Sequence, residues 1–276
     1  MQQFIQELAS LPKWFSVGCA AIMGLAIGSF LTVVVHRLPV VLERAWARDE
    51  GRSVDGGTYN LCVPRSSCPS CGHFLRPWEN IPVFSFILLR GRCSACGAAI
   101  PWRYIAIEVS SACLAVATVY TFGVTGKACA AYLFGASLLA LACIDMKTGL
   151  LPDVMTLPLL ACGLLVNALG GFVTLPDALA GVVGGCAALG VVLVVSLLIT
   201  RREGMGIGDI KLFGAIGAWL GFWAIPQVFL LSFGLAAAHG VFMLARRDAR
   251  LQDAMPFGPF IAIASAFTLF AGVVIR

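Results

Sequence analysis

The sequence has few charged residues: only 12% of its 276 residues are Asp, Glu, Lys or Arg, whereas 59% are hydrophobic. A water-soluble enzyme of 29.1 kDa is excluded, because so few charges cannot cover its surface and the mean hydropathy is +0.92. The formal net charge is only +5, so the composition gives no support for binding to nucleic acid. The chain also lacks heptads, fixed-period repeats and low-complexity tracts. What it has in abundance is long apolar runs, which indicate a membrane protein.

A membrane helix needs roughly 20 consecutive apolar residues, and runs of about this length recur along almost the whole chain. We therefore expect an all-α polytopic membrane protein with about eight transmembrane helices. The first run is too long for a cleaved signal peptide and should stay as a membrane anchor. The expected spans are 14–35, 104–122, 128–144, 154–172, 178–199, 210–225, 226–245 and 256–275.

One long hydrophilic stretch, residues 36–103, separates an anchor domain at 1–35 from a seven-helix membrane domain at 104–276. This loop domain is rich in arginine, so it should face the cytoplasm. Eight spans then leave both termini on the opposite side, which is the periplasm of a Gram-negative inner membrane. The other basic residues agree: on the loop side lie Lys147, Arg201, Arg202, Arg246, Arg247 and Arg250, and opposite lie Lys13, Lys127 and Arg276.

Two C-x-x-C units stand in the loop domain, Cys68 with Cys71 and Cys93 with Cys96. Two such turns supply the four sulfurs that a structural zinc ion prefers, and four sulfurs leave no open position for water or substrate. We expect one structural zinc ion per chain. A disulfide is disfavoured in the reducing cytosol. Two nearby residues are not assigned to the site: Cys62 and His73.

Two acidic residues stand at the expected cytoplasmic ends of spans. Asp145 closes the third span, and Asp209 opens the sixth after glycines at 204, 206 and 208. If the carboxyl groups meet, one proton becomes shared, so one group can activate water while the other polarises an amide carbonyl. The sequence cannot show that they meet, since they lie 64 positions apart. Alternatively, both cap helices, or Asp209 only benefits from the helix dipole.

Other ionisable residues leave different functions open. Glu108 has a structural role in our interpretation, bonded to Arg103 or Tyr104, and Asp177 falls on the far side of the membrane. An ion- or proton-coupled transporter would use intramembrane acids as a relay, but it would place them near the midplane. A non-enzymatic scaffold explains the cysteines but not the glycines before Asp209.

Several motifs together resemble the bifunctional type IV prepilin leader peptidases and N-methyltransferases, which are aspartic proteases of the Gly-x-Gly-Asp type. The resemblance implies that Asp145 and Asp209 are catalytic, with Gly206, Gly208, Lys211 and Asp153 as supporting motif residues. The matching segments are Gly28–Phe30, His36–Pro39, Cys68–Cys71, Glu79–Pro82, Arg90–Cys93, Trp102–Tyr104, Ile144–Asp145, Leu151–Asp153 and Gly204–Lys211.

This resemblance also implies the substrates and cofactors. The chain would remove the leader of type IV prepilins and type II secretion pseudopilins at the cytoplasmic face of the inner membrane. It would then methylate the new N-terminal residue with S-adenosylmethionine. Glu79, Asn80 and Gly91 match loop motifs of the bifunctional members and are our candidates for the methyl-donor site. The alternative is a peptidase without methyl transfer.

Overall fold

The computed structural model describes residues 12–53, 57–201, 205–246 and 255–274. The regular secondary structure of this part of the chain is helical, apart from isolated bridges at Ser67–Phe74 and Arg92–Ala99, and turns and irregular segments join the helices. The expectation of an all-α fold is therefore confirmed. The chain forms two compact units, Met1–Tyr132 and Leu133–Arg276. Five residues of our sequence-based assignments lie outside the described residues: Arg202, Gly204, Arg247, Arg250 and Arg276.

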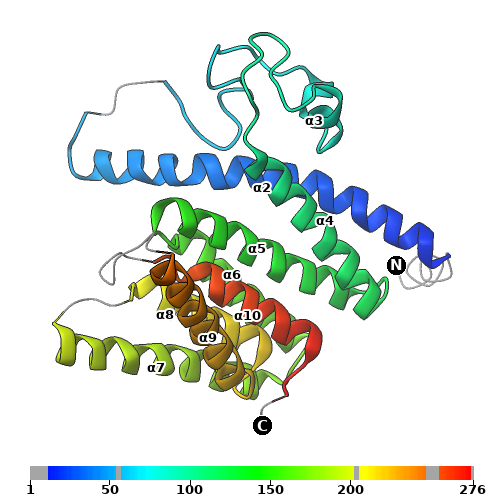
Figure 1. The fold of residues 1–276 in the computed structure, drawn as a ribbon. Helices are drawn as coiled ribbons and strands as arrows, with labels where there is room; N and C mark the ends of the chain where they lie inside the picture. Colours follow the sequence, from blue (N-terminus) through cyan, green and yellow to red (C-terminus); the bar gives the residue numbers. More distant parts are fainter. Residues whose placement is uncertain (1–11, 54–56, 202–204, 247–254, 275–276) are drawn as a thin grey trace. The chain divides into compact units, whose positions relative to one another are not determined.

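Each expected span falls on a helix (Figure 1). Among the described residues, five helices are long and apolar enough to cross a membrane, namely α2, α4, α5, α7 and α9. Three others, α6, α8 and α10, have 16, 14 and 14 residues. At about 1.5 Å per residue, such helices are shorter than a hydrocarbon core of roughly 30 Å. The bounds are α2 Lys13–Asp49, α4 Trp102–Phe122, α5 Gly126–Thr148, α6 Asp153–Ala168, α7 Leu175–Thr200, α8 Ile207–Leu220, α9 Ala224–Ala245 and α10 Gly258–Ala271.

The first helix is longer than its apolar run. We expected the polar loop to begin at residue 36, but α2 continues to Asp49 and contains Pro39. A helix does not have to end where its apolar run ends, because charged side chains simply face water beyond that point. The loop that follows packs back on this extension, since Arg37 donates to the carbonyl of Asn60 and Arg44 lies over the ring of Tyr59.

In the first unit, α2 and α4 pack closely through small residues. A Cβ added at Gly24 or Gly28 would lie within 3 Å of the α4 backbone. Ser111 of α4 also donates to the carbonyl of Gly24 at 2.7 Å. Small residues that allow close approach and a hydroxyl that bonds across are the usual means of joining helices in membranes. Two shorter helices, η1 (Pro77–Asn80) and α3 (Phe84–Leu88), belong to the loop between α2 and α4.

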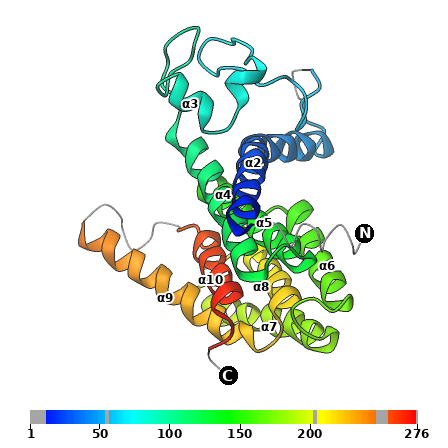
Figure 2. The ribbon, with the colours of Figure 1, turned by 90° about the vertical axis from the view of Figure 1, so that its right-hand side faces the viewer.

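In the second unit, α8 is the central helix, and all of its residues from Leu212 to Leu220 are buried. Its contact with α7 is backbone to backbone, because a Cβ at Gly181 or Gly217 would collide with the opposite glycine carbonyl. Figure 2 shows α8 among the helices of this unit. Trp219 is fully buried and donates its indole N–H to the carbonyl of Leu159 on α6. These contacts fix α8, and with it the residues at its N-terminus.

The end of α8 differs from our expected span, which ran to residue 225. Gly221 has a φ of +82°, and its N–H bonds to the carbonyl of Gly217, so the helix stops there. A positive φ is readily adopted by glycine and closes helices in this way. The chain then restarts as α9 at Ala224.

Candidate active site

Asp145 lies in the last turn of α5 and is only 6% exposed. Its Oδ2 accepts a hydrogen bond of 2.7 Å from the backbone N–H of Gly258, the first residue of α10. The first N–H groups of a helix have no partner within the helix and carry a partial positive charge. The N-terminus of α10 therefore orients this carboxyl group and stabilises its negative charge.

Asp209 is the third residue of α8 and is 7% exposed. Its Oδ2 accepts a bond of 3.1 Å from the N–H of Gly206, the residue that caps the helix. Asp145 is one of the charges that act on this carboxyl group, so the two acids interact although they lie on different helices. Each carboxyl group thus accepts a hydrogen bond from a backbone N–H at a helix N-terminus. Both acids belong to the second unit of the protein.

The two glycines before Asp209 differ in what they contact. Gly206 is extended, and a Cβ there would meet nothing nearer than Asp209 Oδ2 at 3.5 Å. At Gly208 a Cβ would lie 2.9 Å from the Cβ of Leu151. We expected the glycines to admit a substrate backbone, but Gly208 instead admits the chain's own segment before α6. Of these two glycines in the described part of the chain, Gly206 is the less crowded.

Lys211 and Asp153 form an ion pair. Lys211 follows Asp209 by two positions, and Asp153 follows Asp145 by eight. The Lys211 ammonium lies 2.7 Å from each carboxylate oxygen of Asp153. Lys211 is on the first turns of α8, and Asp153 is the first residue of α6. The two motif residues are therefore brought together, and their pair joins the helix that carries Asp209 to a neighbouring helix.

The four cysteines of the two C-x-x-C units come together in the first unit. Their sulfur atoms all lie within 4.8 Å of one another, and Cys68 Sγ is 3.9 Å from Cys96 Sγ. A tetrahedral ion with metal–sulfur bonds of about 2.3 Å needs sulfurs roughly 3.8 Å apart, so the donor set fits. The backbone N–H groups of Ser70 and Cys71 lower the pKa of Cys68 to about 6, whereas the Cys96 thiol and burial raise the pKa of Cys71 to about 12.

Glu79 is buried between the two cysteine turns rather than open to a ligand. Its carboxylate accepts bonds from the Arg76 N–H at 2.7 Å and the Ser94 hydroxyl at 2.5 Å. Both donors lower the pKa of the Glu79 carboxyl group, and the Arg76 N–H has the larger effect. His73 Nε2 lies 3.4 Å from the same carboxylate. Glu79 therefore links residues that adjoin both C-x-x-C units.

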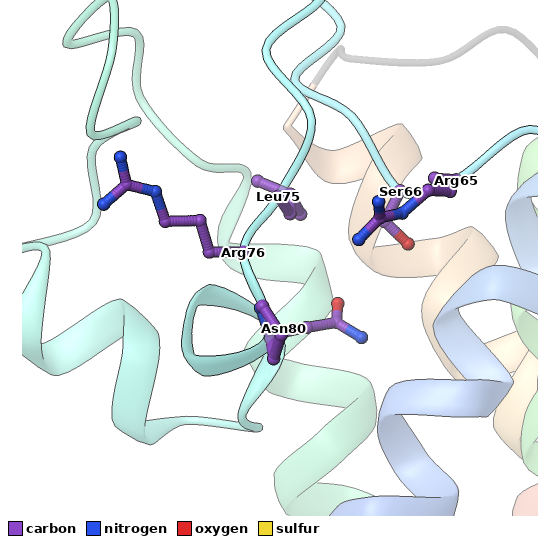
Figure 3. A pocket seen from close by; sticks show the side chains of 6 residues that line it. Arg65, Ser66, Leu75, Arg76 and Asn80 are labelled. Atoms are coloured by element: carbon purple, nitrogen blue, oxygen red, sulfur yellow. The ribbon is translucent and has the colours of Figure 1, made fainter.

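The other two methyl-donor candidates have different surroundings. Asn80 lines a pocket of about 180 Å³ together with Arg65, Ser66, Leu75, Arg76 and Pro77, as Figure 3 shows. Gly91 has a φ of +69°, and a Cβ there would lie 2.8 Å from the ring of Phe86. Gly91 thus fits a turn that packs against α3, whereas Asn80 is the candidate with an adjacent cavity.

Glu108 has partners other than those expected. Its Oε2 accepts a bond of 2.8 Å from the N–H of Val83, whereas Tyr104 bonds to His36 at 2.7 Å. The proposed partners Arg103 and Tyr104 were therefore wrong. The reason is tertiary: the loop folds back on α4 and brings a backbone N–H to the carboxylate.

Gly258 is a residue of the site that our sequence analysis missed. It lies 113 positions from Asp145, in an apolar stretch with no polar side chain nearby. The only local signal is Pro259, which suits the first turn of a helix and so marks a helix N-terminus.

Known proteins match both units of the chain. Residues 22–122 match the Bacterial Peptidase A24 N-terminal domain, and residues 132–241 match the Type IV leader peptidase family. No solved structure matches the chain. Three relatives named prepilin leader peptidase/N-methyltransferase cover nearly all of it. They come from Burkholderia pseudomallei strain K96243 (47% identity over 97% of this chain and 89% of the relative), Pseudomonas aeruginosa (46%, 97% and 94%) and Aeromonas hydrophila (44%, 96% and 94%).

The matched regions extend over both units of the chain. The resemblance inferred from the motifs is thereby confirmed. The chain belongs to the type IV leader peptidase family.

Proposed function

We propose that this protein removes the leader of type IV prepilins and related pseudopilins with Asp145 and Asp209, and then methylates the new N-terminus. The observation that carries the peptidase is the pair of buried, interacting carboxyl groups on α5 and α8. The relatives' names and the family support the substrate class. The same membership disfavours the transporter and the scaffold, neither of which needs two acids held by helix N-termini.

Hydrolysis follows from the chemistry of such a pair. When one proton is shared, the ionised carboxylate takes a proton from water as the water oxygen attacks the amide carbon, and the protonated partner donates to the carbonyl oxygen. Collapse of the tetrahedral intermediate breaks the C–N bond, and the departing amine takes a proton from the site. The products are a leader with a free carboxyl group and a mature chain with a free N-terminal amine.

The proposed topology has eight spans, with the three shorter helices α6, α8 and α10 added to the five long ones. It puts the loop domain and both acids at the cytoplasmic face of a bacterial inner membrane, with the termini in the periplasm. The arginines of the loop support this orientation. A prepilin whose apolar helix lies in the bilayer would then present its leader junction at the level of Asp145 and Asp209.

Methyl transfer is assigned to the loop domain. The pocket beside Asn80 is lined by two arginines, a serine and an asparagine, so it offers donors to a carboxylate such as that of S-adenosylmethionine. Glu79, held between the cysteine turns, would support this region rather than touch the methyl donor. Gly91 would shape the turn that precedes Cys93.

The function is tested with purified protein in nanodiscs and a prepilin peptide, followed by mass spectrometry. We expect loss of the leader, and with added S-adenosylmethionine one extra methyl group on the N-terminal amine. A peptide supplied without its leader should be methylated as well, which separates the two activities. Cleavage without any methyl gain would leave a peptidase only, and no cleavage would reject the proposal.

We further propose that the four cysteines hold one zinc ion, which would lock the two turns together and take no part in the chemistry. Metal analysis should give about one zinc per chain in the unaltered protein. The double variant Cys71→Ser/Cys96→Ser should lose most of it, because hydroxyl groups are poor zinc ligands. Cys62→Ser is the matched control and should keep the metal, since Cys62 is outside the cluster. Equal zinc in both variants would contradict this assignment.

The Lys211–Asp153 pair should have a modest effect on cleavage. Both side chains are partly exposed, and such pairs contribute about 0.2–1 kcal/mol. Lys211→Asp should therefore slow leader removal by roughly fivefold or less if only the pair matters. The exchange Lys211→Asp/Asp153→Lys should restore most of the rate. A loss of several hundredfold that the exchange does not restore would place Lys211 in direct contact with the reacting groups.

A further inference from the structure

The helix α3 exposes its apolar residues within an otherwise polar loop. Phe84, Ile87 and Leu88 are 55%, 69% and 57% exposed, and no residue of the helix is buried. Their spacing of three and four positions places them on one side of the helix, which we call the α3 face. Three large apolar side chains together on five residues are unusual on a surface that faces only water.

The start of α3 is tied to a candidate membrane span. Val83, the residue before α3, donates its N–H to Glu108, which lies in the second turn of α4. The 21 residues of α4 extend about 32 Å at roughly 1.5 Å per residue, close to the thickness of a hydrocarbon core. A span of this length leaves little helix outside the bilayer. Its first two turns, and the chain bonded to them, therefore lie near the headgroups.

The charge around α3 suits an anionic membrane surface. Residues 80–107 contain no Asp or Glu but include Arg90, Arg92 and Arg103. Trp102, the first residue of α4, is 73% exposed. Tryptophan and arginine beside a span are typical of the boundary between headgroups and acyl chains, where the ring and the charge each find a favourable environment.

We propose that the α3 face inserts into the lipid leaflet from which α4 begins, so that lipid covers Phe84, Ile87 and Leu88. The occupant is lipid because the start of α3 is bonded to a candidate span and because arginines, at positions 90, 92 and 103, follow α3 in the sequence. Insertion would also fix the cysteine cluster at the membrane surface. Cys93 follows α3 directly through the turn at Gly91, whose N–H bonds to the carbonyl of Phe86.

The test is photo-cross-linking with the full chain in nanodiscs of phosphatidylethanolamine and phosphatidylglycerol. p-Benzoylphenylalanine replaces Ile87 in one protein and Phe84 in a second, so that a folding failure at one position leaves the other. Both side chains point outward, and a larger aromatic group should be tolerated there. The control carries the cross-linker in place of Ser70, an exposed residue between Cys68 and Cys71.

Mass spectrometry should find lipid adducts at positions 84 and 87 with at least a tenfold higher yield than at position 70. Equal yields at all three positions, or adducts only to this chain, would overturn the proposal. An added prepilin peptide should leave the lipid adducts unchanged. If the peptide is captured at position 87 and the lipid adducts disappear, the α3 face binds substrate and lipid insertion is rejected. None of these results depends on cleavage of the peptide.

Discussion

Asp145→Asn and Asp209→Asn should each abolish leader removal. An asparagine keeps the size and most of the hydrogen bonding of the side chain, but it can neither take a proton from water nor share one with its partner. Loss of a general acid or base costs roughly 10²–10⁴-fold in rate, and loss of one member disables the pair as a unit. Cleavage of a prepilin peptide in nanodiscs, followed by mass spectrometry, measures the effect.

The control for these variants is Asp177→Asn, at the start of α7. Its carboxylate accepts the N–H of Phe222, a bond that an asparagine carbonyl oxygen can also accept. This variant should cleave at nearly the unaltered rate. Methylation of a peptide without a leader should survive in all three variants, which shows that they are folded. If either Asp145→Asn or Asp209→Asn retains more than a tenth of the activity, the two acids are not the catalytic pair.

The two acids could be chosen as candidates from the sequence because each stands in a local signal. Asp209 follows a run of glycines at the start of an apolar stretch, and Asp145 stands where a long apolar stretch ends. Acidic residues at such positions are costly and therefore few, so the choice was small. Their proximity was not predictable, since it depends on how α8 packs against its neighbours.

Other features depend on tertiary contacts that carry no local signal. Glu108 bonds to a backbone N–H, and every residue except proline has one, so no pattern could have selected Val83. The extension of α2 to Asp49 is similar, because an amphipathic segment beyond an apolar run is compatible with either helix or loop. In contrast, the cysteine cluster was found by spacing alone, since two short turns restrict where four sulfurs can lie.

Gly258→Ala should lower leader removal by about 100-fold, the size of effect that a misplacement of about 1 Å can cause. A Cβ at this position would lie 2.7 Å from Asp145 Oδ2 and 3.0 Å from its Cβ. The carboxyl group must then move away and lose the N–H that orients it. Because substrate binding is not disturbed, kcat should fall with little change in KM.

The matched control is Gly234→Ala in α9, where a Cβ would meet nothing within 4 Å. This variant should cleave normally, since alanine is a better helix former than glycine and fills open space. Thermal unfolding separates a positioning role from a structural one: Gly258→Ala should lose activity while its unfolding temperature stays near that of Gly234→Ala. Normal kcat in Gly258→Ala would mean that Asp145 does not need the α10 N-terminus. A rise in KM with a normal kcat would place Gly258 in substrate binding instead, because a displaced Asp145 carboxyl group slows the chemical step and therefore lowers kcat.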